Sequence, residues 1–177
     1  MILDNLLAFD TGANLAQIVG TYNSANIIDL HMAGIPVLAN NQGARDMGVG
    51  DDPALKLLVQ VSVAFASLGA ATLTVNLQGA TDNGSGAPAA YSTWWSSPAY
   101  PLATLVAGAR LFDMDMPRPP AGIAMPRFLR LTYGIGGATT TAGTVQAYIV
   151  IDRMDQPYQG TTPGVMGGYP AGITVAN

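Results

Sequence analysis

The sequence predicts an all-β fold of roughly eight or nine short strands, as in a sandwich, a jelly roll or a barrel. Apolar and polar side chains alternate in several runs, which is the period of a strand with one buried face. The chain contains no Glu and a single Lys, Lys56, so helices built on Glu and Lys are excluded by supply. Its 177 residues fit one domain that can bury a substantial core.

The strongest strand signals come in two pairs of runs. In residues 56–65 the odd-numbered positions are all apolar, and after a short connection the alternation resumes at 73–77. We interpret these two runs as an antiparallel hairpin. A second, looser hairpin is predicted for 127–135 and 144–152, which a Gly- and Thr-rich segment joins. The predicted core consists of Leu57, Val59, Val61, Val63, Leu73, Val75, Leu77, Leu129, Leu131, Tyr133, Val145, Ile149 and Ile151.

Weaker patterns fill the rest of the chain. The further strand candidates are residues 26–32, 34–38, 91–96, 101–106 and 109–113. Three prolines in 117–122 fix the backbone and remove ladder donors, so this segment is predicted to be a loop that crosses between sheets. A helix-like stripe at 3–18 is interrupted by Thr11 and Gly12, which disfavours a helix there.

Composition excludes several functional classes. Charged residues make up 10% of the chain, the net charge is −4, and the six Arg are scattered, so there is no basic stripe for nucleic acid. Cysteine is absent, which excludes disulfides, thiolate nucleophiles and thiolate metal sites. The most apolar stretch, 57–71, is too short to span a bilayer, and the N-terminus lacks the basic region of a signal peptide. We expect no membrane contact and no direct nucleic-acid binding.

The residues suited to catalysis are few. His31 is the single histidine, and no nucleophile-elbow motif accompanies it. The segment 82–86 (Asp-Asn-Gly-Ser-Gly) is rich in oxygen ligands but lacks the distal Glu of a calcium loop, so a hairpin tip is the preferred interpretation. The other paired carboxylates are interpreted as turn and strand-end caps; they are Asp51 with Asp52, Asp113 with Asp115, and Asp152 with Asp155. We expect no enzymatic activity, no cofactor and no metal.

One dense aromatic cluster remains, formed by Tyr91, Trp94, Trp95 and Tyr100. Neighbouring residues of a regular strand point to opposite faces, so one tryptophan is predicted to be core and the other to be available to a partner. Core packing, a protein interface and carbohydrate stacking all stay open for this cluster.

The two ends of the chain differ from its middle. Residues 156–177 contain three prolines and five glycines without strand or helix period, and the first ten residues are mostly apolar. We divide the chain into an N-terminal arm and lead-in (1–25), a β domain (26–155) and a C-terminal arm (156–177). Ile2 and Leu3 in the first arm and Tyr158 and Tyr169 in the last are the candidate partner contacts.

Several segments, in order, resemble one known family. They are Met1-Ile2-Leu3-Asp4, Ile28-Asp29-Leu30, Arg45-Asp46-Met47-Gly48-Val49-Gly50, Pro126 to Tyr133, and Gly143-Thr144-Val145 with Ile151-Asp152-Arg153. Together they resemble the small jelly-roll cement, or decoration, proteins on the heads of tailed bacteriophages. The extension after Gln156 has no equivalent in the pattern that we can place.

The resemblance implies a single-domain jelly roll, or β-sandwich, of about eight strands with extended N- and C-terminal arms. It also implies a protein made in the host cytoplasm that sits on the outer surface of the virion head and clamps neighbouring major capsid proteins. Self-association is expected, and we favour a dimer over a trimer. Arg45 and Asp46 become candidate polar contacts with the capsid, and Trp94 and Trp95 stay candidate partner residues. The alternative is a carbohydrate-binding jelly-roll module of a phage fibre or tail.

Overall fold

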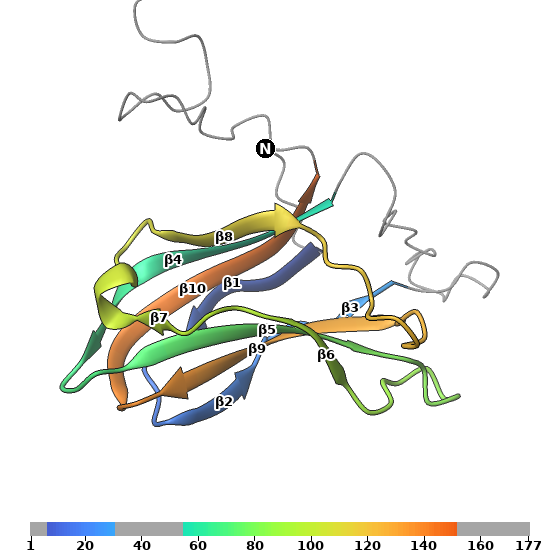
Figure 1. Cartoon of the computed structure of the whole chain (residues 1–177), viewed down its shortest axis with the longest axis horizontal. Coiled ribbons are helices and arrows are strands. Elements are labelled where there is room, and N and C mark those ends of the chain that lie inside the picture. The colour runs from blue at the N-terminus through green and yellow to red at the C-terminus, as the bar shows by residue number, and fades with distance from the viewer. Residues whose placement is uncertain (1–6, 31–54, 152–177) are drawn as a thin grey trace, which may run out of the picture.

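The computed structural model describes residues 7–30 and 55–151, which form two antiparallel sheets packed face to face (Figure 1). The first sheet contains, in spatial order, β1 (Ala8–Asn14), β10 (Thr140–Ile151), β4 (Leu55–Ser67) and β8 (Arg110–Asp115). The second sheet contains, in spatial order, β2 (Gly20–Asn23), β9 (Phe128–Gly136), β5 (Thr72–Ala80) and β6 (Ser92–Ser96). Two short strands complete the second sheet: β3 (Ile28–Asp29) pairs with β9, and β7 (Tyr100–Pro101) pairs with β5.

The strand neighbours show how the chain is rolled. The pairs β1 with β10, β2 with β9, β4 with β8 and β5 with β6 are antiparallel, as in one long ribbon folded back on itself. Rolling that ribbon places β10 beside β4 and β9 beside β5. This is the strand order of a jelly roll, and it confirms the predicted all-β fold.

The two predicted hairpins are wrong, because the strands in each pair belong to opposite sheets. β4 continues into β5 through residues 68–71, and β9 continues into β10 through 137–139. We call these two connections the arches, since each carries the chain from the first sheet to the second or back. Alternation identifies the buried face of a strand, but it does not say whether the next strand pairs beside it or packs opposite it.

The arches lie next to each other at one end of the molecule, since β4 adjoins β10 and β5 adjoins β9. The Ser67 hydroxyl donates a hydrogen bond to the Thr139 carbonyl oxygen at 2.7 Å. Gly69 lies so close to Ala138 that a Cβ on Gly69 would be 2.8 Å from the Cβ of Ala138. Small residues are therefore required where the two connections meet.

The inner faces of both sheets form one core, to which full burial of each large aliphatic side chain contributes roughly 1.5–3 kcal/mol. Val63, predicted to be core, is instead half exposed. Thr144 lies opposite Val63 but Val145 lies opposite Val61, so β4 carries one extra residue there and the alternation is interrupted. The side chain of Ile151 lies outside the described residues. The confirmed core residues are Leu57, Val59, Val61, Leu73, Val75, Leu77, Leu129, Leu131, Tyr133, Val145 and Ile149.

The sandwich begins well before residue 26, because β1 and β2 occupy part of the segment expected to be an arm and lead-in. A register shift against β10 turns both Phe9 and Asp10 toward the core, which hides the strand period. The Asp10 carboxylate accepts hydrogen bonds from the Tyr133 hydroxyl at 2.5 Å and the Ala25 N–H at 2.9 Å. This buried contact links β1 of the first sheet to β9 of the second.

The structure confirms some of the weaker strand candidates and not others. Residues 91–96 and 109–113 correspond to β6 and β8, and 26–32 contains β3. Residues 101–106 are mainly a 3₁₀ turn at Leu102–Thr104, in which the Leu105 N–H donates to the Leu102 carbonyl oxygen at 3.1 Å. The candidate at 34–38 lies outside the described residues.

The proline-rich loop crosses from β8 in the first sheet to β9 in the second, as the sequence predicts. Within residues 7–30 and 55–151, no helix is long and apolar enough to cross a membrane.

Candidate functional site

The two tryptophans both lie on the inner side of β6. The register of β6 against β5 shifts between Trp95 and Thr93, so Trp94 is an extra residue in a bulge. Trp94 is buried in the core, and its indole packs so closely on Gly79 that a Cβ there would be 2.5 Å from the ring. The prediction that neighbouring tryptophans face opposite sides is therefore wrong, because the bulge breaks the alternation.

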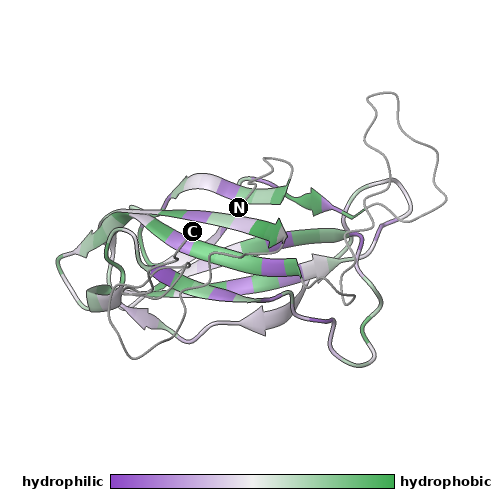
Figure 2. Ribbon diagram, turned by 90° about the horizontal axis from the view of Figure 1, so that it is seen from above, coloured by the Kyte–Doolittle hydropathy of each residue, from purple (hydrophilic) through white to green (hydrophobic). Residues whose placement is uncertain are grey.

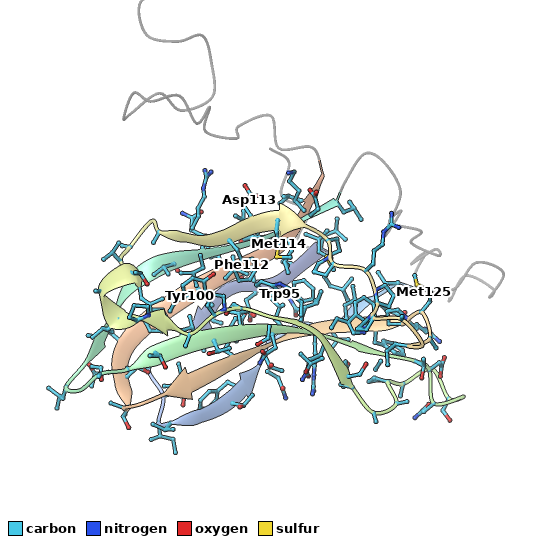
Figure 3. The ribbon with its side chains drawn as sticks, in the orientation of Figure 1. Trp95, Tyr100, Phe112, Asp113, Met114 and Met125 are labelled. Atoms are coloured by element: carbon cyan, nitrogen blue, oxygen red, sulfur yellow. The ribbon has the colours of Figure 1, made fainter. Side chains whose placement is uncertain are left out.

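Trp95 belongs to the side chains that close the gap between the edges of the two sheets. Its ring meets Phe112 of β8 edge to face, with centroids 4.8 Å apart. The Tyr100 hydroxyl donates to the Leu111 carbonyl oxygen at 2.9 Å, which ties β7 to β8. Figure 3 shows Trp95, Phe112 and Met114 in this space between the sheets. Both tryptophans thus act in packing, and neither offers a flat exposed face.

Tyr91, the remaining candidate for a stacking platform, is covered on one face by an arginine. The Arg130 guanidinium carbon lies 3.8 Å from the centroid of the Tyr91 ring. Arg130 Nε also donates to the Gln78 side-chain oxygen at 2.8 Å, and the Gln78 amide donates to the Thr93 hydroxyl at 3.1 Å. Arg130, Gln78 and Thr93 are therefore linked by hydrogen bonds on this outer face of the second sheet.

Arg127 forms the main charged assembly of the described residues. Its side chain is buried, and its Nε and Nη2 donate to the two carboxylate oxygens of Asp29 at 2.9 and 3.0 Å. Its Nη1 donates to Asp82, and the guanidinium also lies against the Phe128 ring. The hydrogen bond and charge of Asp29 raise the pKa of Arg127, as does Asp82, so the guanidinium stays charged. We call the end of the molecule where β3, β5 and the start of β9 meet the Arg127 end.

The oxygen-rich segment 82–86 is a turn held by this arginine. Asp82 Oδ1 accepts the N–H groups of Gly84 at 2.7 Å and Gly86 at 3.0 Å, while Oδ2 accepts from Arg127. Burial alone would raise the pKa of Asp82, but those two N–H groups and Arg127 together lower it. The carboxylate oxygens are thus already bonded to donors, and the hairpin-tip interpretation is supported by the pairing of Asp82 with Pro88.

Of the other predicted carboxylate pairs, Asp113 with Asp115 lies within the described residues. Asp115, at the end of β8, forms an exposed ion pair with Lys56 at 3.3 Å. Asp113 lies on the same strand, opposite Leu58. Among residues 7–30 and 55–151, no group of three His, Cys, Asp or Glu side chains is placed to hold a metal ion.

Most predicted contact residues fall outside the described part of the chain. These contact residues are Ile2, Leu3, Arg45, Asp46, Tyr158 and Tyr169. His31 and the carboxylate pairs at 51–52 and 152–155 also lie outside the described residues.

A feature that the sequence interpretation missed is the end of the molecule formed by the two arches. Segments 15–20 and 102–109 join the arches there. The Gln17 N–H donates to the Thr140 hydroxyl oxygen, and the Thr140 N–H donates to the Gln17 carbonyl oxygen, both at 3.0 Å. The Phe65 N–H donates to the Leu105 carbonyl oxygen at 2.9 Å. We call this the arch end. Its exposed aliphatic residues are Ile18, Val19, Val63, Leu68 and Val106.

Comparison with known families gives one decisive match. A family model described as Bbp16 matches residues 14–149, which is most of the chain and nearly all of the jelly roll. The chain belongs to the Bbp16 family. In this Bbp16 member the match extends from the end of β1 almost to the end of β10, so it includes both the arch end and the Arg127 end. A search of curated proteins finds no match.

Proposed function

We propose that this protein is a structural cement protein that binds the outer surface of a phage head and clamps neighbouring major capsid proteins. The family name suggests a phage-related protein, and the fold is a jelly roll. We further propose that it self-associates on the head, as a dimer rather than a trimer, and that it is not an enzyme.

The observation that carries this proposal is how the described polar groups are used. The Asp82 carboxylate is bonded to two backbone N–H groups and Arg127, and Asp10 is bonded to Tyr133 in the core. These are contacts that hold strands and loops together, whereas a catalytic group must be left with an atom to offer a substrate. A rigid scaffold of this kind suits an adhesive role.

A carbohydrate-binding function gains no support from the geometry. Such a module needs an exposed aromatic platform, but Trp94 is buried, Trp95 packs on Phe112, and Tyr91 lies beneath Arg130. We therefore do not propose the fibre or tail module as a second function.

The test is binding to empty capsids of the same phage that have matured without this protein. The purified full chain is mixed with these capsids, and co-sedimentation is followed together with the thermal transition of the shell. Saturable binding at a fixed ratio with a raised transition is the expected result. If the folded protein does not sediment with the capsids at any concentration, the proposal is wrong.

A further inference from the structure

The described charges are distributed unevenly along the long axis of the sandwich. No charged residue occurs in 11–28, 57–81, 83–109 or 131–151 of the sequence. All four segments that meet at the arch end fall within these ranges, whereas Arg127, Asp29 and Asp82 gather at the opposite end. Figure 2 shows apolar residues at the tip where β4 turns into β5. The four described segments that meet at the arch end therefore carry no charge, and the first charged residue after segment 102–109 is Arg110, at the start of β8.

The arch end also presents large aliphatic side chains to solvent. Leu68, at the tip of the first arch, has an exposed fraction of 101%, and Ile18 one of 68%. Val106 follows the 3₁₀ turn and is 54% exposed. Single exposed aliphatic residues are ordinary on protein surfaces, but several at one end without a charge among them are typical of an interaction site.

The backbone beneath these side chains is held in place. A Cβ on Gly137, whose φ is +76°, would collide with the Ala70 carbonyl oxygen, so the arches are packed closely together. The Gly108 N–H donates to the Val61 carbonyl oxygen at 2.8 Å and fixes the loop that carries Val106. A surface that is already ordered loses little conformational entropy on binding.

We infer that the arch end is the surface by which this protein docks on the capsid, and that its partner is an uncharged, aliphatic patch of the major capsid protein. This inference rests on the proposed cement function and assigns that function to one end of the molecule. Charge matching selects this class of partner, since a charged patch set against the arch end would lose its hydration without gaining an opposite charge. The contact is therefore apolar and insensitive to salt.

The test compares two substitutions that make the same chemical change at opposite ends. Leu68→Asp places a charge on the arch end, and Met125→Asp places one at the Arg127 end, where Met125 is 59% exposed just before β9 (Figure 3). Both side chains are exposed, so both variants are expected to fold, which circular dichroism checks. Each full-length variant is titrated against capsids that lack the protein, at about 50 and 500 mM NaCl.

We expect Leu68→Asp to weaken binding about tenfold or more and Met125→Asp to leave it within about twofold, at both salt concentrations. Equal effects of the two variants, or a larger effect of Met125→Asp, would overturn the assignment of the docking end. A steep loss of wild-type binding in high salt would contradict the inference that the partner patch is uncharged.

Two further outcomes separate the inference from the proposed function. If the wild-type protein does not bind capsids at all, the cement function itself fails. If Leu68→Asp changes the oligomeric state seen by light scattering while capsid binding persists, the arch end contacts a second copy and the assigned partner is wrong.

Discussion

The two ends of this sandwich are built on different chemistry. At the Arg127 end, a buried guanidinium ties β3 and the turn at 82–86 to the start of β9 through two carboxylates. At the arch end, Gly69 packs on the Ala138 side chain and Gly137 packs on the Ala70 backbone, and the large exposed side chains are aliphatic. The comparison teaches that the buried charge at the Arg127 end holds strands and a turn together, whereas the four described segments of the arch end carry no charge.

The largest effect is expected from crowding the arches. Gly137→Ala should lower the free energy of unfolding by about 3 kcal/mol or more, because the new Cβ strikes the Ala70 carbonyl oxygen at a positive φ. Gly108→Ala is the matched control, since Gly108 has a similar φ of +82° with open space around it. It should cost only about 1 kcal/mol. Urea unfolding measures both, and equal losses would show that close packing of the arches contributes nothing.

A smaller effect is expected at the other end. Arg127→Ala should lower the free energy of unfolding by roughly 2–3 kcal/mol, because it leaves the partly buried Asp29 and Asp82 without this cation. Arg130→Ala, which removes a half-buried arginine stacked on Tyr91, should cost about 1 kcal/mol or less. If the two variants unfold alike, Arg127 is not the organising residue of its end.

The smallest effects concern the pH dependence of stability. Asp10 in the core and Asp82 at the Arg127 end should contribute to this dependence with opposite sign. Desolvation raises the pKa of Asp10 despite hydrogen bonds from Tyr133 and Ala25 that lower it. The folded protein therefore holds this proton more tightly, so the contribution of Asp10 to stability is full below the ordinary pKa near 3.8 and is lost as pH rises through the raised value. The pKa of Asp82 is lowered, so its effect on stability has the opposite sign. The contribution of Asp82 to stability is present above pH 3.8 and is lost as the pH falls through the lowered pKa.

These signs are checked by urea unfolding of Asp10→Asn and Asp82→Asn between about pH 3 and 7. Relative to the wild type, Asp10→Asn should gain stability as pH rises, and Asp82→Asn should lose it. Parallel curves for the two variants would contradict the different environments assigned to these carboxylates.

The sequence was informative about which residues are buried and less so about how strands are connected. Leu57, Val59 and Val61 alternate with more polar neighbours, and that pattern suffices to predict a strand and its inner face. It cannot distinguish a hairpin from an arch, because both place alternate residues in the core. The wrong hairpins follow from that ambiguity.

Bulges explain most of the remaining errors. One extra residue near Val63 turns that side chain outward, and another places Trp94 and Trp95 on the same side. Bulges depend on the partner strand as well as on the local sequence, so period-two reasoning misses them. The candidate surface at the arch end did leave a signal, namely the long runs without charge that include Leu68 and Val106.

The central claim is that the arch end meets the capsid while the Arg127 end does not. Hydrogen exchange of the full chain, free and bound to capsids, tests it most directly. Binding should slow exchange in the loops at 68–71, 105–109 and 137–139 and leave 82–90 and 118–125 unchanged. Slowed exchange confined to 82–90 and 118–125 would contradict the account.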